Sequence, residues 1–211
     1  GLTNTFSKKH VRGKIICSKV TRDLVLQLVP DIDKNVFYIL DYDRPTKVKE
    51  DVMVCAIQSY HCDGACMFLF EFSRQRSIHR ALFTGDFRFH EQMRCNKLLA
   101  SDKPLHQLFF DDTFANITQH FPSHKDTKEM ILQKIIEIRG EKGSNAIIRI
   151  HASILGLEPI LRDLADEQNE YFILSEGIKR TYRESQLRYL LPERLINNNN
   201  NNNGNSKTLL K

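Results

Sequence analysis

The stretch that decides the fold is Arg80-Ala-Leu-Phe-Thr-Gly-Asp-Phe-Arg-Phe89. Ala81 to Phe83 is a short apolar run that predicts a β-strand, and Thr84-Gly85 signals a turn directly after it. An acidic side chain, Asp86, then follows at the strand end. A carboxylate in this position can face a cleft without being buried in the sheet, which suits a metal ligand. The alternative is an ordinary Gly-Asp turn, in which Asp86 accepts a hydrogen bond from its own backbone.

A second stretch, Ser59 to Phe72, places a histidine and a glycine just before a strongly apolar strand. It reads Ser-Tyr-His-Cys-Asp-Gly-Ala-Cys-Met-Phe-Leu-Phe-Glu-Phe. The spacing predicts strand, turn and strand, with His61 and Asp86 at the ends of two neighbouring strands. Together they form a plausible half of a metal site, although a lone histidine beside a glycine turn is more often an ordinary loop residue.

These two stretches together resemble the DNA-repair nucleases that have a metallo-β-lactamase fold with a β-CASP domain. The matching segments are His61-Cys62, Gly64-Ala65, Met67 to Glu71 and Thr84 to Arg88. The resemblance implies a 5′-to-3′ DNA exonuclease that acts in the nucleus, in cross-link repair, double-strand-break end processing and telomere maintenance. It further implies a two-zinc site in which one ion is bound by His61 and both are bridged by Asp86. The implied partners are DNA with 5′ ends and other repair or telomere proteins.

A third segment, Leu105 to Phe114, predicts a further strand that ends in acids. It resembles the family segment that carries another acidic site residue, and that catalytic role, shared with Asp86, falls on Asp111. The neighbouring Asp112 departs from the family pattern, which has a threonine there. The alternative is that Asp111 and Asp112 form a turn-capping pair.

The order of the predicted elements indicates an α/β fold, in which a partial metallo-β-lactamase αββα sandwich runs into a βαβα β-CASP segment. We expect the first domain at residues 1–115, the second at 116–192, and a disordered, asparagine-rich tail at 193–211. The expected strands are 14–17, 36–40, 52–58, 67–72 (central), 81–83, 105–114, 146–150 and 171–174. Four helices are expected. The first spans 19–28 after an N-cap at Ser18, and the second starts at a Ser123/Asp126 capping box and ends at Gly140 to Gly143. The third spans 157–165, and the fourth is a basic amphipathic helix at 176–191. A polar hairpin loop is expected at 73–79.

Composition bounds the function only loosely. The chain has 211 residues, is 41% hydrophobic and carries a net charge of +5. A mild basic excess is compatible with a phosphate-backbone partner and equally with many other proteins. No apolar run is long enough to span a membrane. The five cysteines and the absence of a secretion signal favour a reducing compartment, and the Cys62/Cys66 pair is interpreted as packing because no second pair completes a zinc site.

One family motif is missing from these residues. The His-x-His-x-Asp-His metal motif, which in the family lies just before the segment that resembles Gly1 to Thr5, does not occur, and neither do the later histidine motifs. The absent initiator methionine suggests a fragment, a processed product or a trimmed chain, and the resemblance implies that these residues are an internal portion of a family protein. A catalytic zinc needs at least three protein ligands, whereas only His61 and Asp86 carry over. The alternative function is therefore a catalytically incomplete remnant that binds DNA or protein, which Asp63 beside His61 and Leu157 at a family lysine position also favour.

Overall fold

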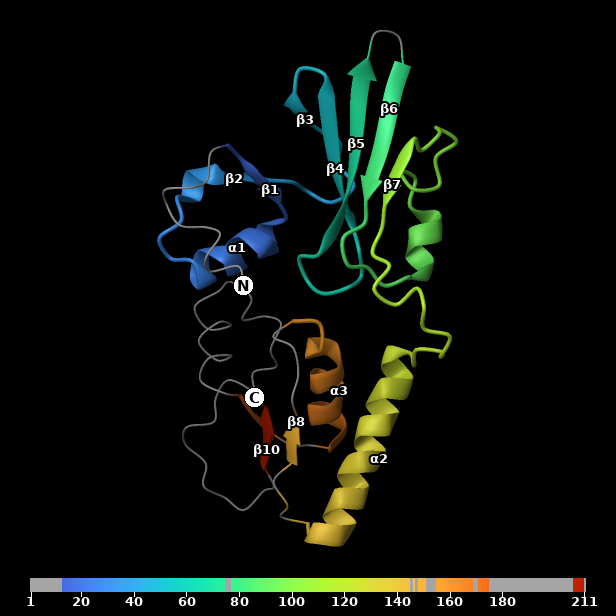
Figure 1. Cartoon of the computed structure of the whole chain (residues 1–211). Coiled ribbons are helices and arrows are strands. Elements are labelled where there is room, and N and C mark those ends of the chain that lie inside the picture. Colours follow the sequence, from blue (N-terminus) through green and yellow to red (C-terminus); the bar gives the residue numbers. More distant parts are fainter. Residues whose placement is uncertain are drawn as a thin grey trace. The chain divides into compact units, whose positions relative to one another are not determined.

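The computed structural model describes residues 13–74, 77–144, 146, 148–150, 155–168, 171–174 and 207–210. The chain divides into two compact units, Gly1–Ile117 and Thr118–Lys211, and each is described by itself (Figure 1). Both units combine helices with β-sheets, so the predicted α/β class is confirmed at this coarse level. Among the described residues, no helix is long and apolar enough to cross a membrane.

The first unit is built on a five-stranded sheet with the order β3-β4-β5-β6-β7. Strands β3 to β6 are antiparallel to their neighbours, while β7 runs parallel to β6. The central position of β5 agrees with its apolar sequence on both faces. The bounds are β3 (Thr46–Lys49), β4 (Val52–Gln58), β5 (Cys66–Arg74), β6 (Ser77–Phe83) and β7 (Gln107–Phe109).

Two predictions for this sheet are wrong in extent, and one strand of it was not predicted. The expected hairpin loop at 73–79 is mostly strand, because Ser73 pairs with Ile78 and Arg74 with Ser77. Their polar side chains suggested a loop, but the pairing needs only the backbone. Strand β3 was not expected at all, and β7 covers only three residues of the predicted 105–114 strand.

Opposite faces of the sheet carry different neighbours. One face holds a buried cluster that includes Ile57, Leu69 and Leu82, and the segment after the 3-10 helix η3 (Glu91–Cys95) covers it with Leu98 and Leu99. The other face holds Val54 and Ala56 together with the phenylalanines of β5. This alternation follows from the two-residue period of a strand.

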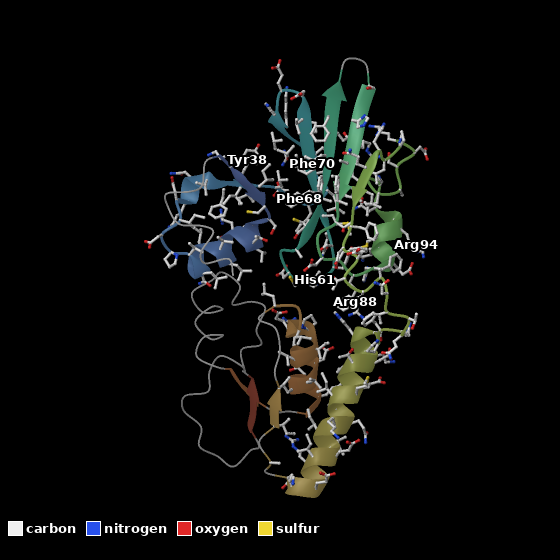
Figure 2. All side chains as sticks on the ribbon, in the orientation of Figure 1. Tyr38, His61, Phe68, Phe70, Arg88 and Arg94 are labelled. Carbon is white, nitrogen blue, oxygen red and sulfur yellow. The ribbon has the colours of Figure 1, made fainter. Side chains whose placement is uncertain are left out.

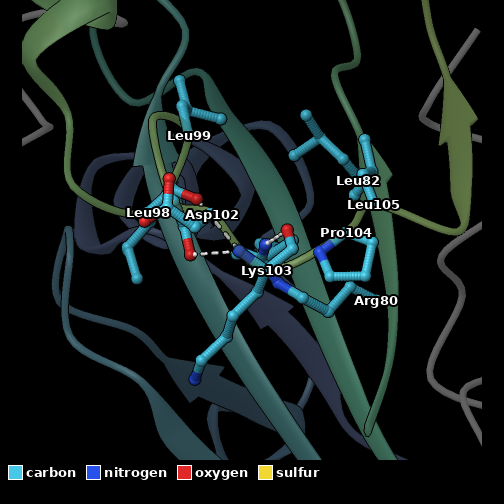
Figure 3. A pocket seen from close by; sticks show the side chains of 10 residues that line it. Arg80, Leu82, Leu98, Leu99, Asp102, Lys103, Pro104 and Leu105 are labelled. Carbon is cyan, nitrogen blue, oxygen red and sulfur yellow. Dashed lines mark hydrogen bonds between the residues drawn. The ribbon is translucent and has the colours of Figure 1, made fainter.

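Arg80 links the segment after η3 to the sheet by hydrogen bonds (Figure 3). Its side chain is only 5% exposed, and its Nη1 and Nη2 atoms donate to the carbonyls of Lys103 at 2.6 Å and Leu98 at 2.9 Å. Its Nε atom lies 3.1 Å from Glu71 Oε1 but without hydrogen-bond geometry, so that pair is held by charge. A cavity of about 290 Å³ lies beside the guanidinium group.

A β-α-β element precedes the sheet in the first unit. It comprises β1 (Ile15–Cys17), α1 (Lys19–Leu28), the 3-10 helix η2 (Lys34–Val36) and β2 (Phe37–Ile39), and β1 is parallel to β2. Ser18 caps α1 as predicted, accepting from the Thr21 amide at 3.2 Å. The same hydroxyl donates to the Gly64 carbonyl at 2.8 Å, so α1 is tied to the turn that carries His61.

The second unit has a three-stranded parallel sheet in the order β8-β10-β9. Its elements are α2 (His124–Lys142), β8 (Ile148–Ile150), α3 (Glu158–Gln168), β9 (Tyr171–Leu174) and β10 (Lys207–Leu210). The Ser123/Asp126 capping box starts α2 as predicted, but the helix continues through Gly140 and ends at Gly143. A helix tolerates an internal glycine at a cost of about 1 kcal/mol, whereas Gly143, with φ +91°, supplies the left-handed end.

Strand β10 lies inside the segment predicted to be a disordered tail, and that prediction is wrong for Lys207–Leu210. The low-complexity tract suggested disorder up to the last residue, but the short apolar run after it pairs with both β8 and β9. The predicted helix at 176–191 and the asparagine tract lie outside the described residues.

Candidate metal centre

The candidate site lies where β4, β6 and β7 end. Because β4 and β6 are both antiparallel to β5, and β7 is parallel to β6, their carboxyl ends meet at one edge of the sheet. His61 follows β4, Asp86 follows β6 and Asp111 follows β7. The prediction that His61 and Asp86 end neighbouring strands is wrong in detail, since β5 lies between β4 and β6. Figure 2 shows His61 at this end of the sheet.

His61 and Asp86 are brought into contact across the width of β5. The Nε2 atom of His61 lies 3.8 Å from Oδ2 of Asp86, and the two side chains are 50% and 73% exposed. An imidazole and a carboxylate this close and this accessible are donors that a divalent metal accepts. The same two side chains form a weak surface ion pair when His61 is protonated.

Asp111 is attached to the same edge through Thr84, which is 4% exposed. The Thr84 amide donates to the Phe109 carbonyl at 2.9 Å, and the Thr84 hydroxyl accepts from the Asp111 amide at 3.2 Å. The turn between Thr84 and Asp86 passes through Gly85 at φ +51°. Thr84 was not predicted as a site residue, although its place in the Thr-Gly-Asp segment was the available signal.

The Asp111 carboxylate is held in its charged form by local hydrogen bonds. Its Oδ1 atom accepts from the Thr113 amide at 3.0 Å and from the Thr113 hydroxyl. These bonds, with a smaller contribution from the nearby His61, lower the pKa of Asp111 below its ordinary value. The turn-capping alternative is thus observed for Asp111.

Tyr60 shapes the turn directly before His61. Its backbone has φ +56°, which is uncommon for a residue other than glycine. Its ring stacks on His90 with centroids 4.2 Å apart, and its hydroxyl donates to Gln92 Oε1 at 2.8 Å. These contacts hold the turn against the η3 segment. No signal in the sequence indicated the left-handed backbone, because it depends on partners about thirty positions away.

The donors present do not complete a zinc site. Across the described ranges, no three histidine, cysteine, aspartate or glutamate side chains are grouped so that they could hold a metal ion. A catalytic zinc takes three protein ligands, so His61 and Asp86 could supply only part of such a set. Burial raises the pKa of Cys66 to about 11, so this thiol stays protonated near neutral pH, which agrees with its interpretation as a packing residue.

Comparison with known proteins shows which proteins the chain is similar to. No protein-family model matches the chain. Over 182 residues it is 32% identical to the 5′ exonuclease Apollo of Rattus norvegicus. This match covers 83% of this chain and 31% of that protein. It is 26% identical over 152 residues to the DNA cross-link repair protein pso2/snm1 of Schizosaccharomyces pombe (72% and 27%), and 31% identical over 143 residues to the protein artemis of Gallus gallus (61% and 20%).

The chain is a relative of the Apollo, Artemis and SNM1 group of DNA-repair proteins. The predicted resemblance is therefore confirmed. The chain spans about a third or less of the lengths of these three relatives.

A solved structure supports the fold alone. A crystal structure of a protein of unknown function from Enterococcus faecalis V583 matches with a TM-score of 0.61 at 15% identity, over 94% of this chain and 53% of that one. This likeness agrees with a mixed α/β architecture and leaves the αββα sandwich as a prediction.

Proposed function

We propose that this chain forms one side of the active site of a metal-dependent DNA-repair nuclease with 5′-to-3′ exonuclease activity. The observation that carries the proposal is the His61–Asp86 pair, whose facing atoms are 3.8 Å apart at the exposed edge where β4 and β6 end. Its relatives include a protein named 5′ exonuclease Apollo and two DNA cross-link repair proteins. The proposed substrate is DNA with a 5′ end, and the proposed location is the nucleus.

The roles proposed for the three side chains follow from their chemistry. The His61 imidazole would ligate one zinc ion, and the Asp86 carboxylate has two oxygens with which to bridge two ions. Asp111, charged and half-buried, would lie at the rim, since Thr113 already donates hydrogen bonds to one of its oxygens. Zinc in such sites activates water for phosphodiester hydrolysis. The remaining ligands would have to come from residues outside this set, because the described residues do not complete the site.

The test is metal content and exonuclease activity on 5′-phosphorylated single-stranded DNA, measured with the product of the complete gene. We expect Asp86→Asn and His61→Ala to lower both zinc content and activity, with activity falling more than about 100-fold. Asp112→Asn is the matched control, because this exposed acid follows Asp111 directly and has no assigned role. A complete product that binds no metal and leaves this DNA uncut contradicts the proposal.

The second candidate is a binding module without catalysis. It is favoured by the incomplete ligand set and by Asp63, which adds an exposed acid beside His61. Its expected signature is DNA binding that persists in a chelator and weakens steeply with salt. Binding of that kind, combined with no metal uptake by the complete gene product, would favour the module over the enzyme.

A further inference from the structure

An exposed aromatic ring lies close to the candidate metal centre, three residues after Asp86. Phe89 is 54% exposed, and the guanidinium carbon of Arg94 lies 5.0 Å from the centroid of its ring. Three residues of chain span at most about 11 Å, so the backbone of Phe89 is within that distance of the backbone of Asp86. The proposed metal chemistry gives neither Phe89 nor Arg94 a role.

The chain is held in place on both sides of Phe89. Directly before it, the Arg88 amide donates to the Ser59 carbonyl at 3.0 Å. Directly after it, the His90 ring stacks on the Tyr60 ring with centroids 4.2 Å apart and planes 6° apart. Both contacts reach the turn that carries the proposed histidine ligand. The ring is therefore presented from a fixed segment that runs alongside this turn.

The arginine beside the ring is also held by its element. Arg94 belongs to η3, which is anchored to the sheet by its neighbour Met93, a member of the buried cluster. The Nε atom of Arg94 lies 3.2 Å from Glu91 Oε2, and both side chains are at least 70% exposed. An ion pair this exposed is weak, so the charge of Arg94 remains available to an anion. Figure 2 shows Arg88 and Arg94 at the same end of the sheet as His61.

A fixed, exposed ring beside positive charge is the arrangement that binds single-stranded nucleic acid. Successive bases stack on aromatic side chains, and cationic side chains attract the phosphates between them. A guanidinium group against the ring adds a cation–π contact to the same stack. Because every base has a π-face, such a contact depends on the presence of a base and very little on its identity.

We propose that Phe89 is a stacking platform for one base of the DNA strand whose 5′ end lies at the metal centre, with Arg94 supporting the ring. The choice of DNA as the ligand rests on the proposed function. The inference adds a base-binding position at a fixed distance from the 5′ end. Phe89 is a positioning residue in this account, since the reacting phosphate is placed by the metal centre and the neighbouring base by the ring.

A scan with abasic nucleotides tests the proposal on the unmutated complete gene product. The probe is 5′-phosphorylated single-stranded DNA with phosphorothioate linkages, which resist hydrolysis, so binding is measured with the metal present. One base is removed at each position in turn, and the dissociation constant is measured by fluorescence anisotropy. Removal at one position near the 5′ end is expected to weaken binding about tenfold, the loss of one base–aromatic stack. A profile without such a position overturns the proposal.

Variants of the ring identify the residue responsible for that position. Phe89→Ala is expected to bind the intact probe about tenfold more weakly and to lose the position-specific effect, whereas Phe89→Trp keeps it. Tyr38→Ala is the control, because Tyr38 is an exposed aromatic residue on β2, outside the segment from Asp86 to Arg94. Zinc content should be unchanged in Phe89→Ala, which separates a stacking role from a structural one. An unchanged abasic profile in Phe89→Ala overturns the proposal.

The outcomes separate this inference from the proposed function. Position-specific binding that depends on Phe89, in a product that leaves unmodified DNA uncut, supports the platform and contradicts the nuclease. Cleavage that depends on Asp86, with equal binding by Phe89→Ala and the unmutated product, supports the nuclease and overturns the platform. A product that neither binds nor cuts this DNA overturns both.

Discussion

At the residue scale, single side chains and single backbone angles place the His61 turn. Gly64 has φ +85°, and its carbonyl accepts from the hydroxyls of Ser18 at 2.8 Å and Thr21 at 3.0 Å. A Cβ at this position would lie 2.9 Å from both Cβ and Cγ1 of Val20. The turn that carries a proposed metal ligand therefore depends on the absence of one methyl group.

Gly64→Ala is expected to destabilise the first unit by about 2–4 kcal/mol, because it combines a left-handed backbone with a clash against a β-branched side chain. Chemical denaturation measures this loss. Gly143→Ala is the matched control, since Gly143 has φ +91° with nothing within 4 Å of an added Cβ, and it should lose only the backbone part. Equal losses in the two variants would show that Val20 moves aside freely.

Asp111 is predicted to titrate abnormally because of Thr113. Its pKa is lowered by the two hydrogen bonds from Thr113, so their stabilisation is present at pH values above the ordinary carboxyl range and is lost as pH falls through the lowered value. Thr113→Val removes the hydroxyl donor and should raise the Asp111 pKa towards its ordinary value. Carboxyl-carbon NMR titration measures the change, and Thr46→Val, whose hydroxyl donates to Arg44, serves as the control. An unchanged Asp111 pKa would contradict the assignment.

At the element scale, the helices depend on local caps, whereas the segment after η3 is held to the sheet by hydrogen bonds from a residue distant in the sequence. The Ser18 and Ser123 caps start α1 and α2 where their sequences indicate. The segment after η3 has few regular hydrogen bonds of its own, and Arg80 connects it to β6 through the Leu98 and Lys103 carbonyls. A buried arginine suits this role because its fork presents several donors at once.

Arg80→Met is expected to cost about 3 kcal/mol, since it leaves two carbonyls and the Glu71 carboxylate without their cation. The free energy of unfolding in urea measures it. Arg94→Met is the matched control, because Arg94 pairs with Glu91 at 3.2 Å while both side chains are at least 70% exposed, and it should cost less than about 1 kcal/mol. A similar cost for both arginines would mean that burial of Arg80 contributes little.

At the scale of the whole molecule, the described residues carry only part of the ligand set of the proposed metal site. Exposed aromatic surface and a two-stranded sheet both lower stability relative to a closed sandwich.

The isolated 211-residue chain is therefore expected to bind no zinc, to leave 5′-phosphorylated DNA uncut, and to unfold at low temperature. Equilibrium dialysis, a nuclease assay and calorimetry measure these three properties, with the complete gene product as the comparison. A cooperative transition at high temperature in the isolated chain would contradict the expectation of marginal stability.

The sequence by itself determined the local elements and the family. Ser18, Ser123 and Gly143 act within a few residues of their own positions, and the apolar runs of β4 and β5 need no partner to be recognised. His61 and Asp86 were proposed as site residues because they sit in segments that resemble motifs of the DNA-repair nuclease family. Short-range hydrogen bonds and side-chain periodicity depend on residues that are close in the sequence, so they can be predicted from the sequence alone.

Only the tertiary structure decided which strands adjoin and what is left uncovered. It showed that β5 separates β4 from β6, that Thr84 connects Asp86 to Asp111, and that Lys207–Leu210 complete a distant sheet. It also showed that Tyr60 has a left-handed backbone held by His90. Each of these depends on contacts between residues far apart in the chain, and such pairings follow from the packing of whole elements rather than from any local pattern.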